Sequence, residues 1–178
     1  PYGKFREPLG HLKRSNCVIL TRTDQLNDIE KERLRREIHW VHPNAPMIEA
    51  NYRPKHILHI SSGKQISLDH LVGRRISAFA GIGNPDSFLR VARQFSQVVD
   101  FKIYLDHTFY SKKTMEQLLR DAEKKASDLI LTTEKDAVRI PKDILKSNPP
   151  LYALSVDLEI TKGKAALDAL LDHLPCPF

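Results

Sequence analysis

From residue 75 onward, short apolar runs alternate with stretches in which apolar residues recur every three or four positions. The short runs are typical of buried strands, and the longer spacing is typical of amphipathic helices. Because alternating strands and helices are joined by crossover connections, this pattern predicts an α/β fold: an open, mainly parallel sheet with helices on both faces, Rossmann-like in the broad sense. The expected strands are 76–80, 98–105, 128–132 and 152–156. The helix after the first strand carries Phe88, Leu89, Ala92 and Phe95, and the helix after the second carries Met115, Leu118, Leu119 and Ala122. A shorter helical segment follows the third strand, and a last helix with Leu167, Leu170 and Leu171 follows the fourth.

The first 74 residues show a less regular pattern. A helical stretch at 8–14 leads into a strand at 16–21, and a helix should follow with Thr23 or Asp24 as its N-cap. This helix should end at His42, because the residue before a proline avoids the helical region. Its apolar positions are Leu26, Ile29, Leu34, Ile38 and Val41.

Two short extended segments, at 47–51 and 56–60, complete this first part. We therefore expect two parts. Residues 1–74 run from a proline-bounded loop through a βα unit and the two extended segments, and residues 75–178 form a lobe of βα repeats.

Composition narrows the class of protein. Hydrophobic residues make up 41% and charged residues 28% of the 178 positions, which fits an ordinary globular domain. The longest purely apolar runs are short, such as the four residues from Cys17 to Leu20, whereas a membrane span needs about 20 residues. The two cysteines lie far apart, so they indicate a reducing compartment and neither a disulfide framework nor a zinc site. The start at Pro1, in a turn-rich stretch, suggests a piece of a longer protein.

The charge is unevenly distributed. The chain has 28 Lys and Arg against 22 Asp and Glu, a formal net charge of +6. Residues 1–75 hold 14 basic and 8 acidic residues, so the whole excess lies there. An acidic partner is therefore expected for this part of the chain.

Ligands of open parallel sheets bind outside the carboxyl ends of the strands, so the strand-to-helix turns are the places to look for chemistry. The first is the turn after 76–80, with Gly81 and Gly83, then Asn84 as a good N-cap and Pro85 at the first helical position. The glycines would let backbone amides approach an anion at the helix N-terminus. They also fit a plain tight turn.

The second turn is Asp106-His107, after the apolar strand. A carboxylate beside an imidazole can orient the ring, tune its pKa or share a proton. An aspartate that caps a turn beside an exposed histidine is the alternative.

The third turn is the segment 132–139, with Thr133, Glu134, Lys135, Asp136 and Arg139. Hydroxyls and carboxylates suit magnesium or a sugar, and the cations suit phosphate. Alternatively, Thr133 caps a short helix whose dipole the carboxylates favour.

A fourth feature precedes the sheet. Arg6 and Glu7 lie in a proline-bounded loop, where they could position a ligand or form a surface ion pair. The chain has no Gly-x-x-x-x-Gly-Lys-Ser/Thr, no Gly-x-Ser-x-Gly, no His-Glu-x-x-His and no Cys-x-x-Cys. A self-sufficient kinase, hydrolase or zinc enzyme is therefore not expected.

Together these blocks resemble the tetraacyldisaccharide 4'-kinase (lipid A 4'-kinase) family. The matching blocks are PYGKFREPLGHLKRS at 1–15, SAFAGIGNPDSF at 77–88, LDH at 105–107 and LTTEKDAVR at 131–139. Their order and spacing resemble the later half to two-thirds of that family, and they span most of the chain. The resemblance implies a C-terminal lobe related to P-loop kinases, without the N-terminal P-loop part.

The resemblance also implies the chemistry. It implies transfer of the γ-phosphate of ATP, with Mg²⁺, to the 4'-hydroxyl of a tetraacyldisaccharide 1-phosphate, at the cytoplasmic face of the bacterial inner membrane. Asp106 and His107 match the family's aspartate–histidine pair, expected to act in catalysis. Arg6 and Glu7 match its Arg-Glu motif near the active site. Substrate- or nucleotide-facing roles are expected for Gly81, Gly83, Asn84, Thr133, Glu134, Lys135, Asp136 and Arg139, and a metal ligand is assigned to none.

The expected partners are ATP, the glycolipid disaccharide, an anionic membrane surface and an N-terminal P-loop lobe of the same protein. The chain alone is expected not to turn over ATP. Two alternatives stay open: a non-catalytic nucleotide- or nucleic-acid-binding module, and a degenerate lobe kept for structure. Acidic residues interleave with the basic ones in 1–75, and the aromatic residues there are dispersed, so a nucleic-acid partner is not expected.

Overall fold

The computed structural model describes residues 7–173. The chain forms two compact units, Pro54–Asp157 and, from its two ends, Pro1–Arg53 with Leu158–Phe178. The expected boundary between residues 74 and 75 is not where these units divide. The reason is that two long strands, β2 (Met47–His59) and β7 (Leu151–Lys162), each contribute to both units.

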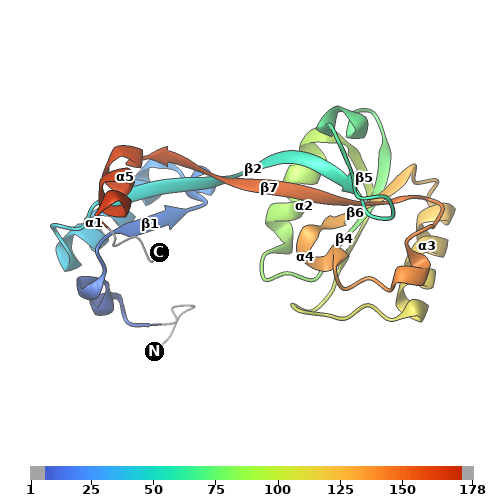
Figure 1. Ribbon diagram of the computed structural model, residues 1–178, viewed down its shortest axis with the longest axis horizontal. Coiled ribbons are helices and arrows are strands. Elements are labelled where there is room, and N and C mark those ends of the chain that lie inside the picture. The colour runs from blue at the N-terminus through green and yellow to red at the C-terminus, as the bar shows by residue number, and fades with distance from the viewer. Residues whose placement is uncertain (1–6, 174–178) are drawn as a thin grey trace. The chain divides into compact units, whose positions relative to one another are not determined.

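The unit of residues 54–157 contains the predicted βα repeat (Figure 1). Strands β4 (Arg75–Ala80), β5 (Gln97–Ile103), β6 (Leu129–Thr133) and β7 lie in the order β5-β4-β6-β7, and all three adjacent pairs are parallel. Helices α2 (Pro85–Phe95) and α3 (Lys112–Lys124) make the crossovers, and α4 (Glu134–Ala137) follows β6. The predicted α/β class, an open and mainly parallel sheet, is confirmed.

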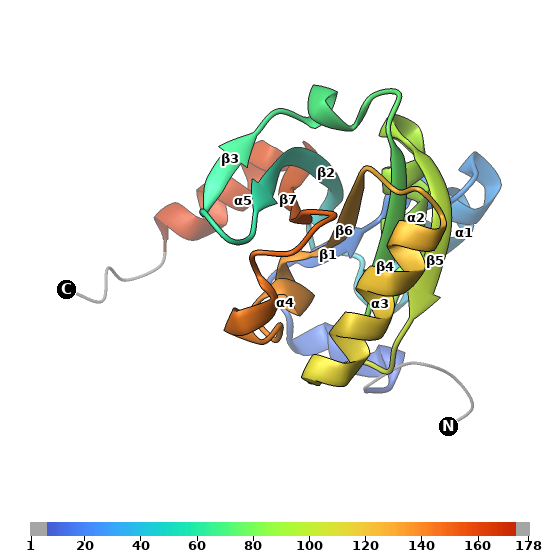
Figure 2. The same ribbon diagram turned by 90° about the vertical axis from the view of Figure 1, so that its right-hand side faces the viewer.

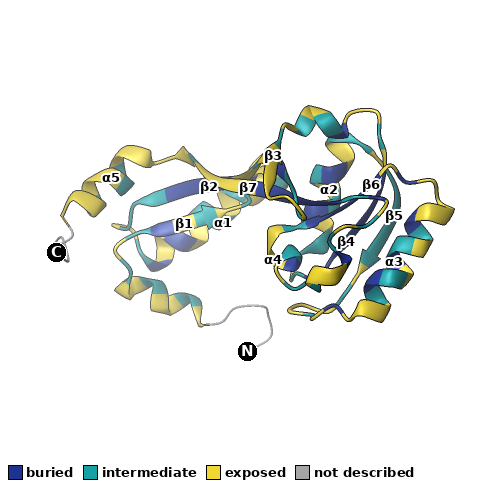
Figure 3. Ribbon diagram, turned by 45° about the vertical axis from the view of Figure 1, so that its right-hand side comes forward, coloured by how far each residue is buried: buried dark blue, intermediate teal, exposed yellow. Residues whose placement is uncertain are grey.

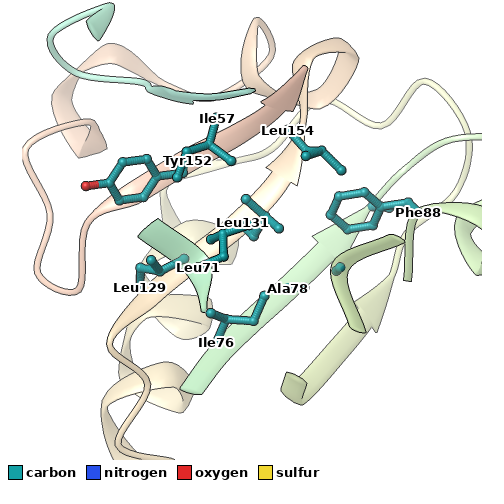
Figure 4. Packing of buried hydrophobic residues seen from close by; sticks show 11 residues of the cluster. Ile57, Leu71, Ile76, Ala78, Phe88, Leu129, Leu131, Tyr152 and Leu154 are labelled. Atoms are coloured by element: carbon teal, nitrogen blue, oxygen red, sulfur yellow. The ribbon is translucent and has the colours of Figure 1, made fainter. Parts of the chain in front are cut away.

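Helices α2 and α3 cover opposite faces of this sheet, because the β4–β5 and β5–β6 crossovers run in opposite directions along the strand order (Figure 2). Ile76, Ala78 and Ala80 of β4 pack in one cluster with Phe88 and Ala92 of α2. Figure 4 shows this cluster, which also includes residues of β6 and β7. On the other face, Phe79 packs with side chains of α3, namely Met115, Leu118 and Ala122.

Burial follows the same layers. Strands β4 and β6 are almost entirely buried, whereas the outer sides of the helices are exposed (Figure 3). Strand β3 (Lys64–Ile66), which the sequence pattern did not indicate, pairs antiparallel with β2. Short 3₁₀ turns occupy Leu68–Leu71 and Lys142–Ile144.

The other unit contains the 3₁₀ turn Leu9–Arg14, strand β1 (Val18–Thr21), helix α1 (Asp28–Val41) and helix α5 (Lys164–Asp172). Strand β1 pairs parallel with β2. The expected N-cap was wrong: Asn27 caps α1, accepting from the Glu30 amide, while the Glu30 side chain accepts from the Asn27 amide. Thr23 instead starts a 3₁₀ turn and is buried, where it donates to Asn51.

The two expected extended segments form one strand, β2, which runs through Arg53 and Pro54. Proline restricts the residue before it to extended conformations, so an Arg-Pro step is compatible with a continuous strand wherever the missing amide is not needed for pairing.

Candidate functional site

The strand order places three loops at one edge of the sheet. From β4 the chain goes to β5 on one side, and then returns across β4 to β6 on its other side. The loops after β4 and β6 therefore lead away in opposite directions. Such a topological switch point is the usual ligand-binding edge of an open α/β sheet. The three turns selected from the sequence are the ones that lie there.

Asp136 joins the three loops. Its carboxylate is completely buried and accepts hydrogen bonds from the Gly81 amide at 3.0 Å, the Tyr110 hydroxyl at 2.9 Å and the Thr133 hydroxyl at 2.7 Å. These donors come from the loop after β4, the loop after β5 and the last residue of β6, respectively. In return, the Asp136 amide donates to Thr133 Oγ1 at 3.2 Å, which caps α4. The carboxylate is therefore a structural hub.

Tyr110 was not predicted as part of the site. It is buried, and burial followed by the charge of Asp136 raises the pKa of its hydroxyl far above the ordinary value. The phenol consequently stays protonated and keeps donating to the carboxylate. Tyr110 directly precedes Ser111, the N-cap of α3, but the adjacent Phe109 is aromatic too, so the sequence offered no signal that distinguishes the buried ring from the exposed one.

Asp106 and His107 form the turn after β5. His107 has a left-handed backbone, with φ 63°, which is uncommon outside glycine. Its amide donates to the Gly81 carbonyl at 3.2 Å and to Asp106 Oδ1 at 3.0 Å, and these bonds hold the strained turn against the end of β4. The side chains of both residues are exposed, at 78% for His107 and 50% for Asp106. Their Nε2 and Oδ2 atoms lie 3.8 Å apart.

Arg139 connects this exposed pair to the buried hub. Its Nη2 lies 3.0 Å from His107 Nδ1, and its Nη1 lies 3.7 Å from Asp136 Oδ1. The side chain is only 16% exposed, so the guanidinium is largely withdrawn from solvent. A carboxylate, a guanidinium, an imidazole and a second carboxylate thus follow one another from the interior to the surface.

Because Gly81 has no side chain, the loop after β4 can lie close to the loop after β5. A Cβ on Gly81 would lie 2.8 Å from the Tyr110 hydroxyl and 3.0 Å from the Leu105 carbonyl, so no side chain fits there. A Cβ on Gly83 would lie 3.5 Å from Asp106 Oδ2, which is an ordinary contact. Asn84 accepts from the Ser87 amide at 3.0 Å and caps α2, as predicted.

The other predicted residues are Glu134, Lys135, Glu7 and Arg6. Glu134 and Lys135 lie on α4 with exposed side chains. Glu7 lies in the other compact unit, where hydrogen bonding to His11 and the charge of Arg14 lower the pKa of its carboxyl. Arg6 lies outside the described residues.

Within residues 7–173, no three His, Cys, Asp or Glu side chains gather in a way that could hold a metal ion. No helix in the same range is both long and apolar enough to cross a membrane.

The fold and the site define an α/β lobe whose polar side chains meet at the switch point of a parallel sheet. Comparison with known proteins is more specific. The family model described as "Tetraacyldisaccharide-1-P 4'-kinase" (LpxK) matches residues 1–175, and the chain belongs to this family. The sequence resemblance is thereby confirmed.

Relatives named "Tetraacyldisaccharide 4'-kinase" include those of Elusimicrobium minutum, 34% identical over 98% of this chain and 46% of that protein, and of Anaeromyxobacter sp. strain K, 33% identical over 99% and 48%. A crystal structure described as "apo" form LpxK from Aquifex aeolicus in complex with ATP has the same fold, with a TM-score of 0.59 and 22% identity, over 94% of this chain and 45% of that one. The chain spans about half the length of the relatives it matches.

Proposed function

We propose that this chain is the C-terminal part of a kinase that transfers the γ-phosphate of ATP to the 4'-hydroxyl of a tetraacyldisaccharide 1-phosphate, a lipid A precursor. Family membership over residues 1–175 supports the reaction class. The observation that carries the proposal for the site is the meeting of Asp106, His107 and Arg139 at the switch point of the sheet. An exposed acid–imidazole pair on a rigid base is what a lobe that closes over a phosphoryl-transfer site would contribute.

The proposal divides the chemistry between two lobes. Phosphoryl transfer depends mostly on positioning and on neutralising charge around the transferred group. The P-loop motif Gly-x-x-x-x-Gly-Lys-Ser/Thr, which cradles nucleotide phosphates in such kinases, does not occur in the 178 residues. We therefore assign the ATP phosphates and Mg²⁺ to an N-terminal P-loop lobe of the same protein. This chain would supply Asp106 and His107 and help to exclude water when the cleft closes.

The other predicted residues take different roles in this proposal. The Gly81 amide and the Asp136 carboxylate already have partners inside the lobe, so we assign them a supporting role. The exposed Lys135 and Glu134, together with Thr133, Gly83 and Asn84, remain candidates for contact with substrate or nucleotide. Arg6 and Glu7 are proposed to reach the active site from the first segment of the chain.

The test uses the intact protein that carries this chain. Asp106→Asn and His107→Ala should each lower kcat of the 4'-kinase reaction by about a hundredfold or more, as expected for groups that act at the reacting atoms. Asp143→Asn is the matched control, because Asp143 is exposed and pairs only with Lys112, at 3.2 Å, among its described neighbours. Unchanged kcat in both site variants would favour a degenerate lobe.

A second experiment tests the division between lobes. The 178-residue chain by itself should show no ATP-dependent phosphorylation of the disaccharide, because the phosphate-binding half of the proposed site is missing from it. Phosphorylation by this chain alone would contradict the proposal.

We also propose that the intact protein works on an anionic membrane surface, at the cytoplasmic face of the bacterial inner membrane. The basic excess of residues 1–75 supports this, since a net positive charge is attracted to an acidic lipid surface. Binding to liposomes should rise with their anionic lipid content and fall with added salt. Equal binding to neutral and anionic liposomes would refute this part.

A further inference from the structure

The contact between Arg139 and His107 restricts the chemistry of the imidazole. A guanidinium only donates hydrogen bonds. Because Arg139 Nη2 lies 3.0 Å from His107 Nδ1, the Nδ1 atom must accept, and the ring proton must be on Nε2. A proton on Nδ1 would face the donor instead and break this contact.

The buried carboxylate of Asp136 holds Arg139 in position. Asp136 is completely buried, and hydrogen bonds from Gly81, Tyr110 and Thr133 hold its carboxylate in place. Its Oδ1 lies 3.7 Å from Arg139 Nη1, beyond hydrogen-bonding distance, so charge attraction joins the two. With only 16% of its side chain exposed, Arg139 has little freedom to turn to another partner.

The exposed end of this series is Asp106. Its Oδ2 lies 3.8 Å from His107 Nε2, so the ring edge that carries the proton faces the carboxylate. His107 has a left-handed backbone, which two hydrogen bonds from its amide stabilise, and the contact of Nδ1 with Arg139 orients the ring. The ring therefore presents a donor, and the neighbouring carboxylate presents an acceptor, on the same exposed surface.

We propose that Arg139 is a positioning residue that, anchored by Asp136, holds His107 in the Nε2–H tautomer, so that His107 serves the proposed kinase site as a hydrogen-bond donor and not as a proton acceptor. This rests on the proposed function for its role in catalysis, but the tautomer itself is a property of the lobe. Arg139 thus reaches the reaction only through His107.

The tautomer is read from long-range ¹H–¹⁵N correlation spectra of the 178-residue chain labelled at the histidine rings, with His107→Gln identifying the His107 signals. The unsubstituted chain should show the Nε2–H form. Arg139→Met should give a mixture of the two tautomers. Arg139→Lys should do the same while preserving the positive charge beside Asp136, because one ammonium cannot span both partners.

Lys142→Met is the control, since it removes an exposed cation from the same β6–β7 connection and should leave the His107 signals unchanged. Arg139→Lys also covers the case in which Arg139→Met does not fold. A predominant Nδ1–H form in the unsubstituted chain, or an unchanged Nε2–H form in a folded Arg139 variant, would overturn the proposal.

Kinetics of the intact protein separate this inference from the proposed function. Arg139→Lys should lower kcat about tenfold to a hundredfold, with the KM for ATP nearly unchanged, as expected when a reacting group is misplaced. A change in KM alone would count against a positioning role. If the unsubstituted intact protein showed no 4'-kinase turnover, the proposed function would fail, while the spectra would still decide the tautomer.

Discussion

Replacing Asp136 by alanine should strongly destabilise the lobe of residues 54–157. The substitution removes a completely buried carboxylate that accepts from Gly81, Tyr110 and Thr133. It leaves the buried Gly81 amide unpaired, which costs about 1–3 kcal/mol. It also leaves the guanidinium of Arg139, 16% exposed, without its counter-charge.

Because these contributions share one side chain, they do not simply add, and removing one partner of a buried ion pair typically costs about 3–5 kcal/mol in total. We expect a loss of that size in the free energy of unfolding. Asp136→Asn keeps the shape, but either orientation of the amide turns its NH₂ toward donors. A smaller loss of about 1–3 kcal/mol is therefore expected.

The assay is urea denaturation of the 178-residue chain, followed by far-UV circular dichroism, together with hydrogen exchange of amides in β4 and β6. The exchange measurement assigns the loss to this lobe, because both strands lie within it. Asp143→Asn, an exposed carboxylate in one surface ion pair, should change stability by less than about 1 kcal/mol. A loss below about 1 kcal/mol for Asp136→Ala would refute the reasoning, because the hub would then be unimportant.

Four further substitutions test the local structure. Gly81→Ala should lower the free energy of unfolding by about 1–3 kcal/mol, because the new Cβ would lie 2.8–3.1 Å from the Tyr110 hydroxyl, the Leu105 carbonyl and the Asp136 carboxylate. Gly83→Ala should lower it much less. Chemical denaturation of both variants measures the difference, and equal losses would contradict the steric argument. Burial raises the pKa of Glu49, but the hydrogen bond from Arg35 and its charge lower this pKa by more, so the pKa lies below its ordinary value. The ionised Glu49 therefore stabilises the fold at pH values above its ordinary pKa, and this contribution is lost as the pH falls through the lowered pKa. The loss of stability caused by Glu49→Gln should be largest near neutral pH and smaller in acid. A loss that grew in acid would be inconsistent with this reasoning. Asn27→Ala should lower stability by about 1 kcal/mol through loss of the α1 cap, measured by thermal unfolding, and no change would mean that the capping box contributes nothing.

Local patterns were sufficient for the repeat and for the positions of the turns that form the candidate site. The turn at Gly81 and Asn84 was predicted because glycines and a capping residue act within a few positions of themselves. The Asp106-His107 turn was found because it follows an apolar strand. The expected strand 98–105 ends at residue 103 in the structure, so the polar pair belongs to a loop two residues longer than expected.

Choices between equivalent local signals could not be made from the sequence. Thr23, Asp24 and Asn27 are all good caps, and Asn27 was selected because Thr23 is buried against Asn51, which lies in a different element. The single strand β2 likewise depends on its neighbours, since an Arg-Pro step is equally compatible with a loop.

The sequence by itself determined the α/β class, the chemical groups at each turn and the family resemblance, because these depend on residue type and on short spacings. Only the tertiary structure decided that Asp136 is a buried hub and that Arg139 contacts His107. Those contacts join loops that are 26 to 55 residues apart in sequence, and they exist because the strand order brings β4, β5 and β6 to a common edge. No local pattern encodes which carboxylate at such an edge is buried and which one is exposed, since packing of the whole sheet determines it.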